Sequence, residues 1–152
     1  MMMQQIRMKL NMISRSANPT ESQIQCAIVE WANLQSFAMG KVGDFLIAIK
    51  NEGKQNVFKN KQRKSYCPTG QRYNKEGRKK GVSDLFLALP KIDKLENIIL
   101  CGFWRELKSK GKKPTKEQSA WLMLMRLAGY DADWSDDAGV VIQDIKDYLG
   151  IK

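Results

Sequence analysis

The sequence of 152 residues predicts one α/β domain whose elements follow the order α-β-β-β-α-β-α. Two observations support this order. Apolar residues at helical spacing follow a capping box in two places, and three runs rich in branched and aromatic residues lie between them. A chain of this length buries roughly 68–70% of the surface that its unfolded form exposes, so it can build one real core but not two large domains.

The first predicted helix begins after Thr20, which has the capping-box spacing to Gln23, and runs to about Phe37. Its apolar positions recur every three or four residues, and Glu21 falls on the same face. We therefore expect this carboxylate to point toward the body of the protein. The alternative is a first-turn Glu that is favoured only by the helix dipole.

Three strand-like runs follow the first helix, over residues 45–50, 82–89 and 98–108. Alternation along the second run separates Asp84 from its leucine neighbours, and alternation along the third puts Trp104, Glu106 and Lys108 on one face. If these two strands are neighbours, Asp84 and Glu106 converge on one divalent cation, with Lys108 beside its bound water. Trp104 would then either pack beneath this site or stack on a base.

A second helix is predicted to begin after Thr115, which has the capping-box spacing to Gln118, and to end at Gly129. A short fourth strand over residues 130–134 follows it. Ser135 is predicted to cap a last helix, because apolar residues at helical spacing come after it. No internal repeat interrupts this order.

Composition excludes several classes of function. Histidine is absent, so no mechanism with an imidazole base or ligand is possible, and acid, base or metal chemistry must use carboxylates. Three cysteines without paired short spacing indicate reduced thiols rather than a zinc knuckle or a disulfide framework. The longest apolar run, residues 98–104, is too short to span a membrane, and residues 1–18 do not resemble a secretory signal. We expect a cytoplasmic protein.

The net charge of +10 is concentrated in one stretch of the chain. Residues 50–80 hold eleven Lys or Arg and two Glu, and Phe58, Tyr66 and Tyr73 are interleaved with them. This pattern favours contact with a nucleic-acid backbone, although a solvated, flexible loop has the same composition. A second basic block covers residues 105–116. We expect a mobile N-terminal arm over residues 1–18 and a domain over residues 19–152 with a basic insertion at about 54–80.

The pairing of Asp84 and Glu106 with Lys108 matches the needs of phosphodiester hydrolysis. That reaction needs a cation on the phosphoryl oxygens, a water of lowered pKa and a cationic group near both. The simpler interpretation is a surface ion pair between Glu106 and Lys108 and a turn-forming Asp84, because a lone Glu-x-Lys tripeptide is common.

Several short motifs stand in order along the chain: Glu21-Ser22-Gln23-Ile24-Gln25, Asn51-Glu52-Gly53, Gly81-Val82-Ser83-Asp84-Leu85, Glu106-Leu107-Lys108, Gly111 through Thr115 and Gln118 to Trp121, and Gly129-Tyr130. As a set, over roughly residues 20–134, they resemble the VRR-NUC domain of the PD-(D/E)XK nuclease superfamily. The resemblance implies a restriction-endonuclease-like core, αβββαβ, with a mixed central sheet flanked by helices. One departure is Ser83, where the family usually has Pro; we expect it to alter backbone geometry more than chemistry.

The resemblance also implies roles for single residues. Asp84, Glu106 and the backbone carbonyl of Leu107 would bind Mg²⁺ or Mn²⁺, Lys108 would position or activate the attacking water, and Glu21 would complete the acidic site from the first helix.

Gln118 matches the additional active-site glutamine of the family and would contact the water or the scissile phosphate. Its other interpretation is the capping partner of Thr115, and one amide is not expected to fill both roles without compromise. The residues expected to contact DNA are Lys54, Lys79, Lys80, Lys110 and Lys112.

Small stand-alone members of this family resemble phage or bacterial proteins that act as dimers on branched DNA, in the manner of Holliday junction resolvases. The resemblance therefore implies a metal-dependent DNA endonuclease, selective for branched DNA such as four-way junctions. It would work as a homodimer in a bacterial or phage-infected cytoplasm, without a membrane partner. Two alternatives stay open: a DNA-binding module of the same fold that does not cleave, and an enzyme of that fold with another target, such as a sequence-specific restriction-type endonuclease or an RNase.

Overall fold

The computed structural model describes residues 18–49 and 79–152, together with residues 4, 8, 58–59, 65–66, 75 and 77. The predicted N-terminal arm and most of the predicted basic insertion lie outside the described residues.

Among the described residues, four strands form the central sheet in the order β10-β9-β6-β3. The antiparallel part consists of β3 (Leu46–Ala48), β6 (Leu85–Leu87) and β9 (Phe103–Leu107). The edge strand β10 (Asp131–Ser135) runs parallel to β9, so a crossover must join the two. The predicted α/β class with a mixed sheet, and the expectation that the second and third strands are neighbours, are both confirmed.

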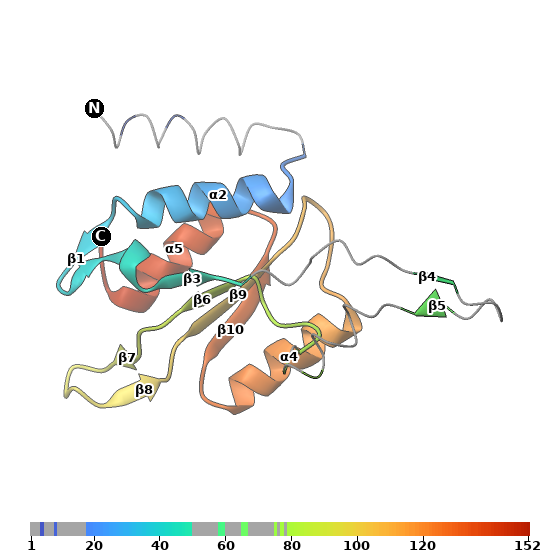
Figure 1. Ribbon diagram of the computed structural model, residues 1–152. Coiled ribbons are helices and arrows are strands. Elements are labelled where there is room, and N and C mark those ends of the chain that lie inside the picture. Colours follow the sequence, from blue (N-terminus) through green and yellow to red (C-terminus); the bar gives the residue numbers. More distant parts are fainter. Residues whose placement is uncertain are drawn as a thin grey trace.

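Helices cover both faces of this sheet (Figure 1). On one face, α2 (Glu21–Ala32) packs against β9 and against α5 (Ala138–Leu149), which also contacts β10. On the other face lies the crossover helix α4 (Lys116–Leu127), which packs on β9 and β10. None of the helices in the described segments combines the length and apolar character that crossing a lipid bilayer requires.

The hydrophobic core lies between the sheet and the α2–α5 layer. Leu85, Leu87, Phe103 and Leu107 are fully buried there, and the ring of Phe103 meets that of Tyr148 of α5 edge-on. Because side chains alternate along a strand, the intervening residues of β6 and β9 face α4 instead. The two faces therefore differ: one is the aliphatic core, and the other holds polar and aromatic groups.

On the α4 face, Trp104 stacks on Phe86 with ring centroids 4.3 Å apart, and Trp121 of α4 meets it edge-on at 5.8 Å. Trp104 is thus a packing residue beneath α4 rather than a free platform for a base. Tyr130 closes the same aromatic layer. This layer fixes the distance between α4 and the sheet.

The remaining elements are short. They are β1 (Ser36–Phe37) paired with β2 (Gly40–Lys41), the 3₁₀ turn η1 (Val42–Asp44), β4 (Phe58–Lys59) paired with β5 (Ser65–Tyr66), and β7 (Lys91–Ile92) paired with β8 (Ile98–Leu100).

Two predicted boundaries were wrong. The first helix ends at Ala32 instead of about Phe37, because the chain reverses through the β1–β2 hairpin, where Gly40 has a φ of 133°. The strand predicted over residues 98–108 is two strands, since β8 pairs with β7 while β9 joins the central sheet. Gly102 separates them at a point where a Cβ would meet the ring of Phe86 at 3.0 Å.

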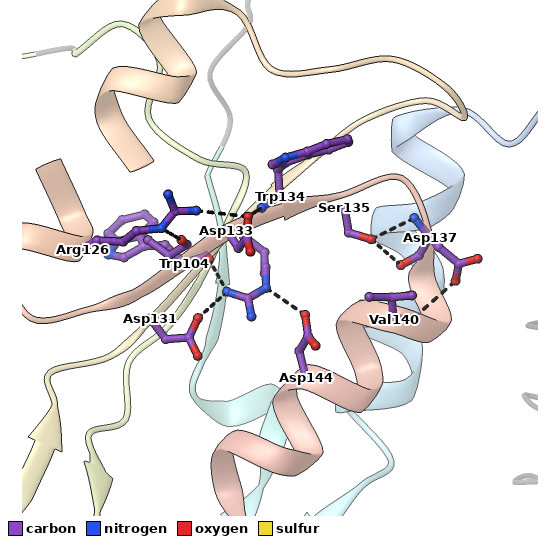
Figure 2. Close-up of polar contacts among 11 residues, drawn as sticks. Trp104, Arg126, Asp131, Asp133, Trp134, Ser135, Asp137, Val140 and Asp144 are labelled. Atoms are coloured by element: carbon purple, nitrogen blue, oxygen red, sulfur yellow. Dashed lines mark hydrogen bonds and ion pairs between the residues drawn. The ribbon is translucent and has the colours of Figure 1, made fainter. Parts of the chain in front are cut away.

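The last helix also has a different cap from the one predicted. Asp137 caps α5 by accepting the N–H groups of Gly139 and Val140, whereas Ser135 ends β10 and its Oγ accepts the N–H of Asp137 (Figure 2). Ser and Asp are about equally good caps, but Ser135 still belongs to β10, so the capping position falls on Asp137.

Arg105, the first residue of the second basic block, belongs to the structural framework. Its side chain is buried and donates to Asp131 at 2.7 Å and to Asp144 of α5 at 3.1 Å. Figure 2 labels these two carboxylates. The guanidinium carbon also lies 3.8 Å from the ring centroid of Phe103. Arg105 therefore ties β9, β10 and α5 together.

Candidate active site

Asp84 and Glu106 meet at one end of the central sheet because of the strand register. Leu85 pairs with Arg105 in the antiparallel β6–β9 ladder, so one further step along it places Asp84 opposite Glu106. The Oδ2 atom of Asp84 accepts the backbone N–H of Leu107 at 2.8 Å. This bond fixes Asp84 against the strand that carries Glu106.

Glu106 is fully buried, and its two carboxylate oxygens have different surroundings. Oε1 accepts from Lys108 Nζ at 2.7 Å and from the Nε2 group of Gln118. Oε2 is buried and has no hydrogen-bond partner among the described residues. A buried carboxylate oxygen without a partner is costly unless something else satisfies it, so this atom indicates a place for a ligand.

The same burial changes the ionisation of Glu106. Burial raises the pKa of its carboxyl to about 7, against the opposing effect of the Lys108 hydrogen bond, and the charges of Asp84 and Glu21 add to the rise. Burial works to lower the pKa of Lys108, but its hydrogen bond and charge contact with Glu106 outweigh this and raise it. Lys108 therefore stays cationic at neutral pH, while Glu106 is divided between its acid and its carboxylate form.

Glu21 approaches the site from the first turn of α2. Its Oε1 accepts the N–H of Ser109 at 3.3 Å and lies 3.6 Å from Lys108 Nζ, although its side chain is 47% exposed. The predicted capping box holds this turn. Thr20 Oγ1 accepts the backbone N–H of Gln23, and the backbone N–H of Thr20 donates to the Gln23 side chain. Lys108 thus lies between a buried and an exposed carboxylate.

Gln118 caps α4 and also contacts the candidate site. Its Oε1 accepts the N–H of Thr115 at 2.8 Å, which completes the capping box of α4. Its Nε2 meanwhile donates to Glu106 Oε1. One end of the amide therefore caps the helix while the other end contacts Glu106, because the first turn of α4 lies directly beside the end of β9. The expected contact with the water or the scissile phosphate stays a prediction.

The loop after Lys108 is fastened by a residue that the sequence analysis missed. Asp136 accepts the N–H of Gly111 at 2.8 Å, and its other oxygen lies 3.6 Å from Lys110 Nζ. The hydrogen bond from Gly111 lowers the pKa of Asp136. Asp136 follows a strand that is remote in sequence from this loop, so only the parallel pairing of β9 with β10 reveals the contact.

The lysines expected to contact DNA lie around the first turn of α4. Lys79 and Lys80 are exposed and directly precede Gly81. Hydrogen bonds at the start of α4 lower the pKa of Glu117, and the nearby charge of Lys80 contributes to this. Lys112 is exposed and Lys110 is half-exposed, both in the loop that leads to α4, whereas Lys54 lies outside the described residues.

Gly81 allows the segment before β6 to pass close to the first turn of α4. Its φ is 78°, and a Cβ at this position would lie 2.6 Å from the backbone carbonyl of Glu117. We expect Gly81→Ala to lower the free energy of unfolding by about 2–4 kcal/mol, because backbone strain and a backbone clash add together. Chemical denaturation measures this loss.

Gly150 is the matched control. Its φ of 66° is similar, but a Cβ there would have nothing within 4 Å. Gly150→Ala should therefore lose only about 1 kcal/mol, from the left-handed backbone alone. Equal losses in the two variants would contradict a role for Gly81 in seating α4.

The donor set suits a hard divalent cation that keeps several of its waters. No group of three or more Asp, Glu, Cys or His side chains in the described part of the chain is close enough to form a complete protein cage. Mg²⁺ does not need one, because it commonly binds through one or two carboxylates and completes its shell with water. Glu106 Oε2 and the neighbouring Asp84 fit this requirement.

Comparison with solved structures places this geometry in a known fold. The chain is similar to a VRR_NUC domain protein with a TM-score of 0.67 and 19% sequence identity, over 88% of this chain and 90% of that chain. No family model and no curated protein matches the sequence. The chain has the VRR-NUC fold, as its motifs predicted.

Proposed function

We propose that this chain is a divalent-metal-dependent DNA endonuclease that hydrolyses phosphodiester bonds with Mg²⁺ or Mn²⁺. The observation that carries the proposal is the state of Glu106: fully buried, clamped at Oε1 by Lys108 and Gln118, and without a described partner at Oε2. A surface ion pair does not account for this arrangement, because it would leave both oxygens in water. The VRR-NUC fold supports the same class of activity.

Asp84, Glu106 and the backbone carbonyl of Leu107 would hold the cation. When bound, it would supply charge stabilisation at the phosphoryl oxygens and lower the pKa of a coordinated water. Lys108 is buried between Glu106 and Glu21 and keeps its proton, so it offers a fixed positive charge beside the reacting phosphate. Its donors can orient the attacking water. No histidine is needed for any of these roles.

The substrate that this surface suits is a nucleic-acid backbone. Lys79, Lys80 and Lys112 are exposed around the first turn of α4, and Gln118 of that turn reaches Glu106. Lysines in this place would hold phosphates next to the carboxylates and make binding depend on salt. We extend the proposal to branched DNA such as four-way junctions, cut by a homodimer, because a two-fold axis would present two sites to two strands.

The first test is cleavage of labelled four-way junction, flap, duplex and single-stranded DNA in Mg²⁺, Mn²⁺ or EDTA. Wild type should cut in either metal and not in EDTA. We expect Lys108→Ala to lose at least about 10²-fold in rate, the usual contribution of a group that handles a proton or stabilises charge in the transition state. The preferred substrate identifies the DNA structure that the enzyme recognises.

Lys94→Ala is the control for the loss of one positive charge. Lys94 is exposed in the turn between β7 and β8, which follows the opposite end of β6 from Asp84. Its removal should leave cleavage unchanged. Cutting that persists in EDTA, or that survives undiminished in Lys108→Ala, would contradict the proposed mechanism. Tight junction binding without cutting would favour a binding module instead.

A further inference from the structure

The hydrogen bonds around Gln118 decide which end of its amide faces the candidate site. The N–H of Thr115 can only donate, so the Gln118 atom that it meets at 2.8 Å must be the carbonyl oxygen. The NH₂ group is therefore the end that meets Glu106 Oε1. As long as the cap of α4 holds, Gln118 presents a donor to the site and never an acceptor.

This orientation has a consequence for Glu106. Its Oε1 receives two donors, Lys108 Nζ and Gln118 Nε2, which come from two different elements. Two such contacts fix the plane of the carboxylate, since rotation would break one or both. Oε2 is then held in one place with its lone pairs unused by the described residues. Lys108 and Gln118 thus hold Oε1 in place, and Oε2 stays available for a ligand.

We propose that Gln118 is a positioning residue, which acts through Glu106 and does not touch the cation or the scissile phosphate. The capping box of α4 locks its amide so that the NH₂ group, together with Lys108, holds Oε1 and leaves Oε2 free to bind the divalent ion. Since this role presupposes the proposed metal-dependent function, its test must separate the two. Partners that orient a metal ligand typically contribute 10–100-fold to metal affinity.

The chain offers a matched control, because α2 begins with the same capping box. Thr20 and Gln23 repeat the bonds of Thr115 and Gln118, but Gln23 is exposed. Gln118→Met and Gln23→Met each remove one capping side chain and should lower Tm by a similar amount. Only Gln118→Met also removes the donor to Glu106.

Calorimetric titration of the metal-free proteins with Mn²⁺ distinguishes the outcomes. We expect Gln118→Met to bind Mn²⁺ about 10–100-fold more weakly than wild type, and Gln23→Met to stay within about twofold. Equal Mn²⁺ affinity in Gln118→Met and wild type would overturn the positioning role and leave Gln118 as a cap. Absence of Mn²⁺ binding by wild type would overturn the proposed function itself, and this role with it.

Gln118→Glu provides a second test that does not depend on the stability of the Met variant. A carboxylate still accepts the N–H of Thr115, so the cap persists, but at pH 8.5, where the new carboxyl is ionised, it donates nothing to Glu106. We expect DNA cleavage to fall at least about tenfold, while Lys94→Ala, which lowers the net charge by the same amount, leaves it unchanged. Wild-type cleavage by Gln118→Glu would show that the carbonyl end is the one that works, and would overturn the assignment.

Discussion

Replacing Asp84 with Asn is expected to reduce metal-dependent DNA cleavage by at least about 10³-fold, which corresponds to about 4 kcal/mol of transition-state stabilisation. The amide loses the negative charge that a divalent cation needs. It keeps an oxygen that can still accept the N–H of Leu107, the bond that fixes Asp84 to β9. Single-turnover cleavage with saturating enzyme measures the loss directly.

DNA binding should behave in the opposite way. Removing a carboxylate beside the expected path of the phosphate lowers electrostatic repulsion, so affinity measured in EDTA should be unchanged or tighter. Asp147→Asn, an exposed change on α5, controls for the general effect of one negative charge less. Wild-type turnover in Asp84→Asn would remove Asp84 from the metal site, and a parallel loss of binding and cleavage would indicate a folding defect instead.

The features that the sequence predicted correctly are set by interactions between residues close together in the chain. Both capping boxes are complete within four residues, so Thr20 with Gln23 and Thr115 with Gln118 could be identified without any tertiary information. The alternation of buried and half-buried residues through Leu85 to Leu87 is a property of a single strand. The convergence of Asp84 and Glu106 needed one further assumption, that their strands are neighbours, and the structure confirms it.

What the sequence could not predict depends on contacts between distant segments. Arg105 opens the second basic block of the sequence, yet its side chain is buried in ion pairs with Asp131 and Asp144. Asp136 fastens the loop at Gly111 only because β10 lies parallel to β9. Gly102 is a weak signal of a break inside a strand-like run, but the packing against Phe86 that requires a glycine there involves another strand.

Gln118 lies between these two cases. Its capping role is local, and its contact with Glu106 is tertiary. From the sequence, the cap was expected to compete with a contact to the attacking water or the phosphate, because the amide was treated as one group. An amide is a donor and an acceptor at separate atoms, so a helix cap can orient a side chain toward a site as well as stabilise the helix. Within the described part of the chain, the side chain of Gln23 in the second capping box bonds only to Thr20, and Gln23 therefore serves as the control.

The ionisation of Glu106 leads to the second large effect, on stability in the absence of metal. A carboxyl whose pKa is raised from 4.5 to about 7 by folding contributes stability below pH 4.5, and this contribution is lost as the pH rises through 7. At about 1.4 kcal/mol per unit, the loss amounts to about 3 kcal/mol. The charged groups that face this carboxyl are Lys108, Asp84 and Glu21. Lys108 already offsets part of the effect of burial on the pKa of Glu106.

Glu106→Gln should therefore stabilise the metal-free protein at pH 8 relative to wild type, and by much less at pH 4.5. A neutral amide does not titrate, and its oxygen can still accept from Gln118 and Lys108. A difference of about 3 kcal/mol corresponds to a Tm higher by about 6–12 °C in a protein of this size. Thermal unfolding in EDTA across this pH range, with wild type and variant side by side, gives the comparison.

Adding Mg²⁺ at pH 8 should make the Tm of wild type higher than that of Glu106→Gln. The cation binds the ionised carboxylate of wild type and stabilises its folded state by mass action, whereas the amide variant gains little stability. The same substitution then raises Tm in EDTA and lowers it, relative to wild type, in excess Mg²⁺. A Tm difference that does not depend on pH would mean that Glu106 titrates normally. A Tm difference that depends on pH but does not change with Mg²⁺ would mean that burial raises the pKa of Glu106 but that Glu106 does not bind the cation.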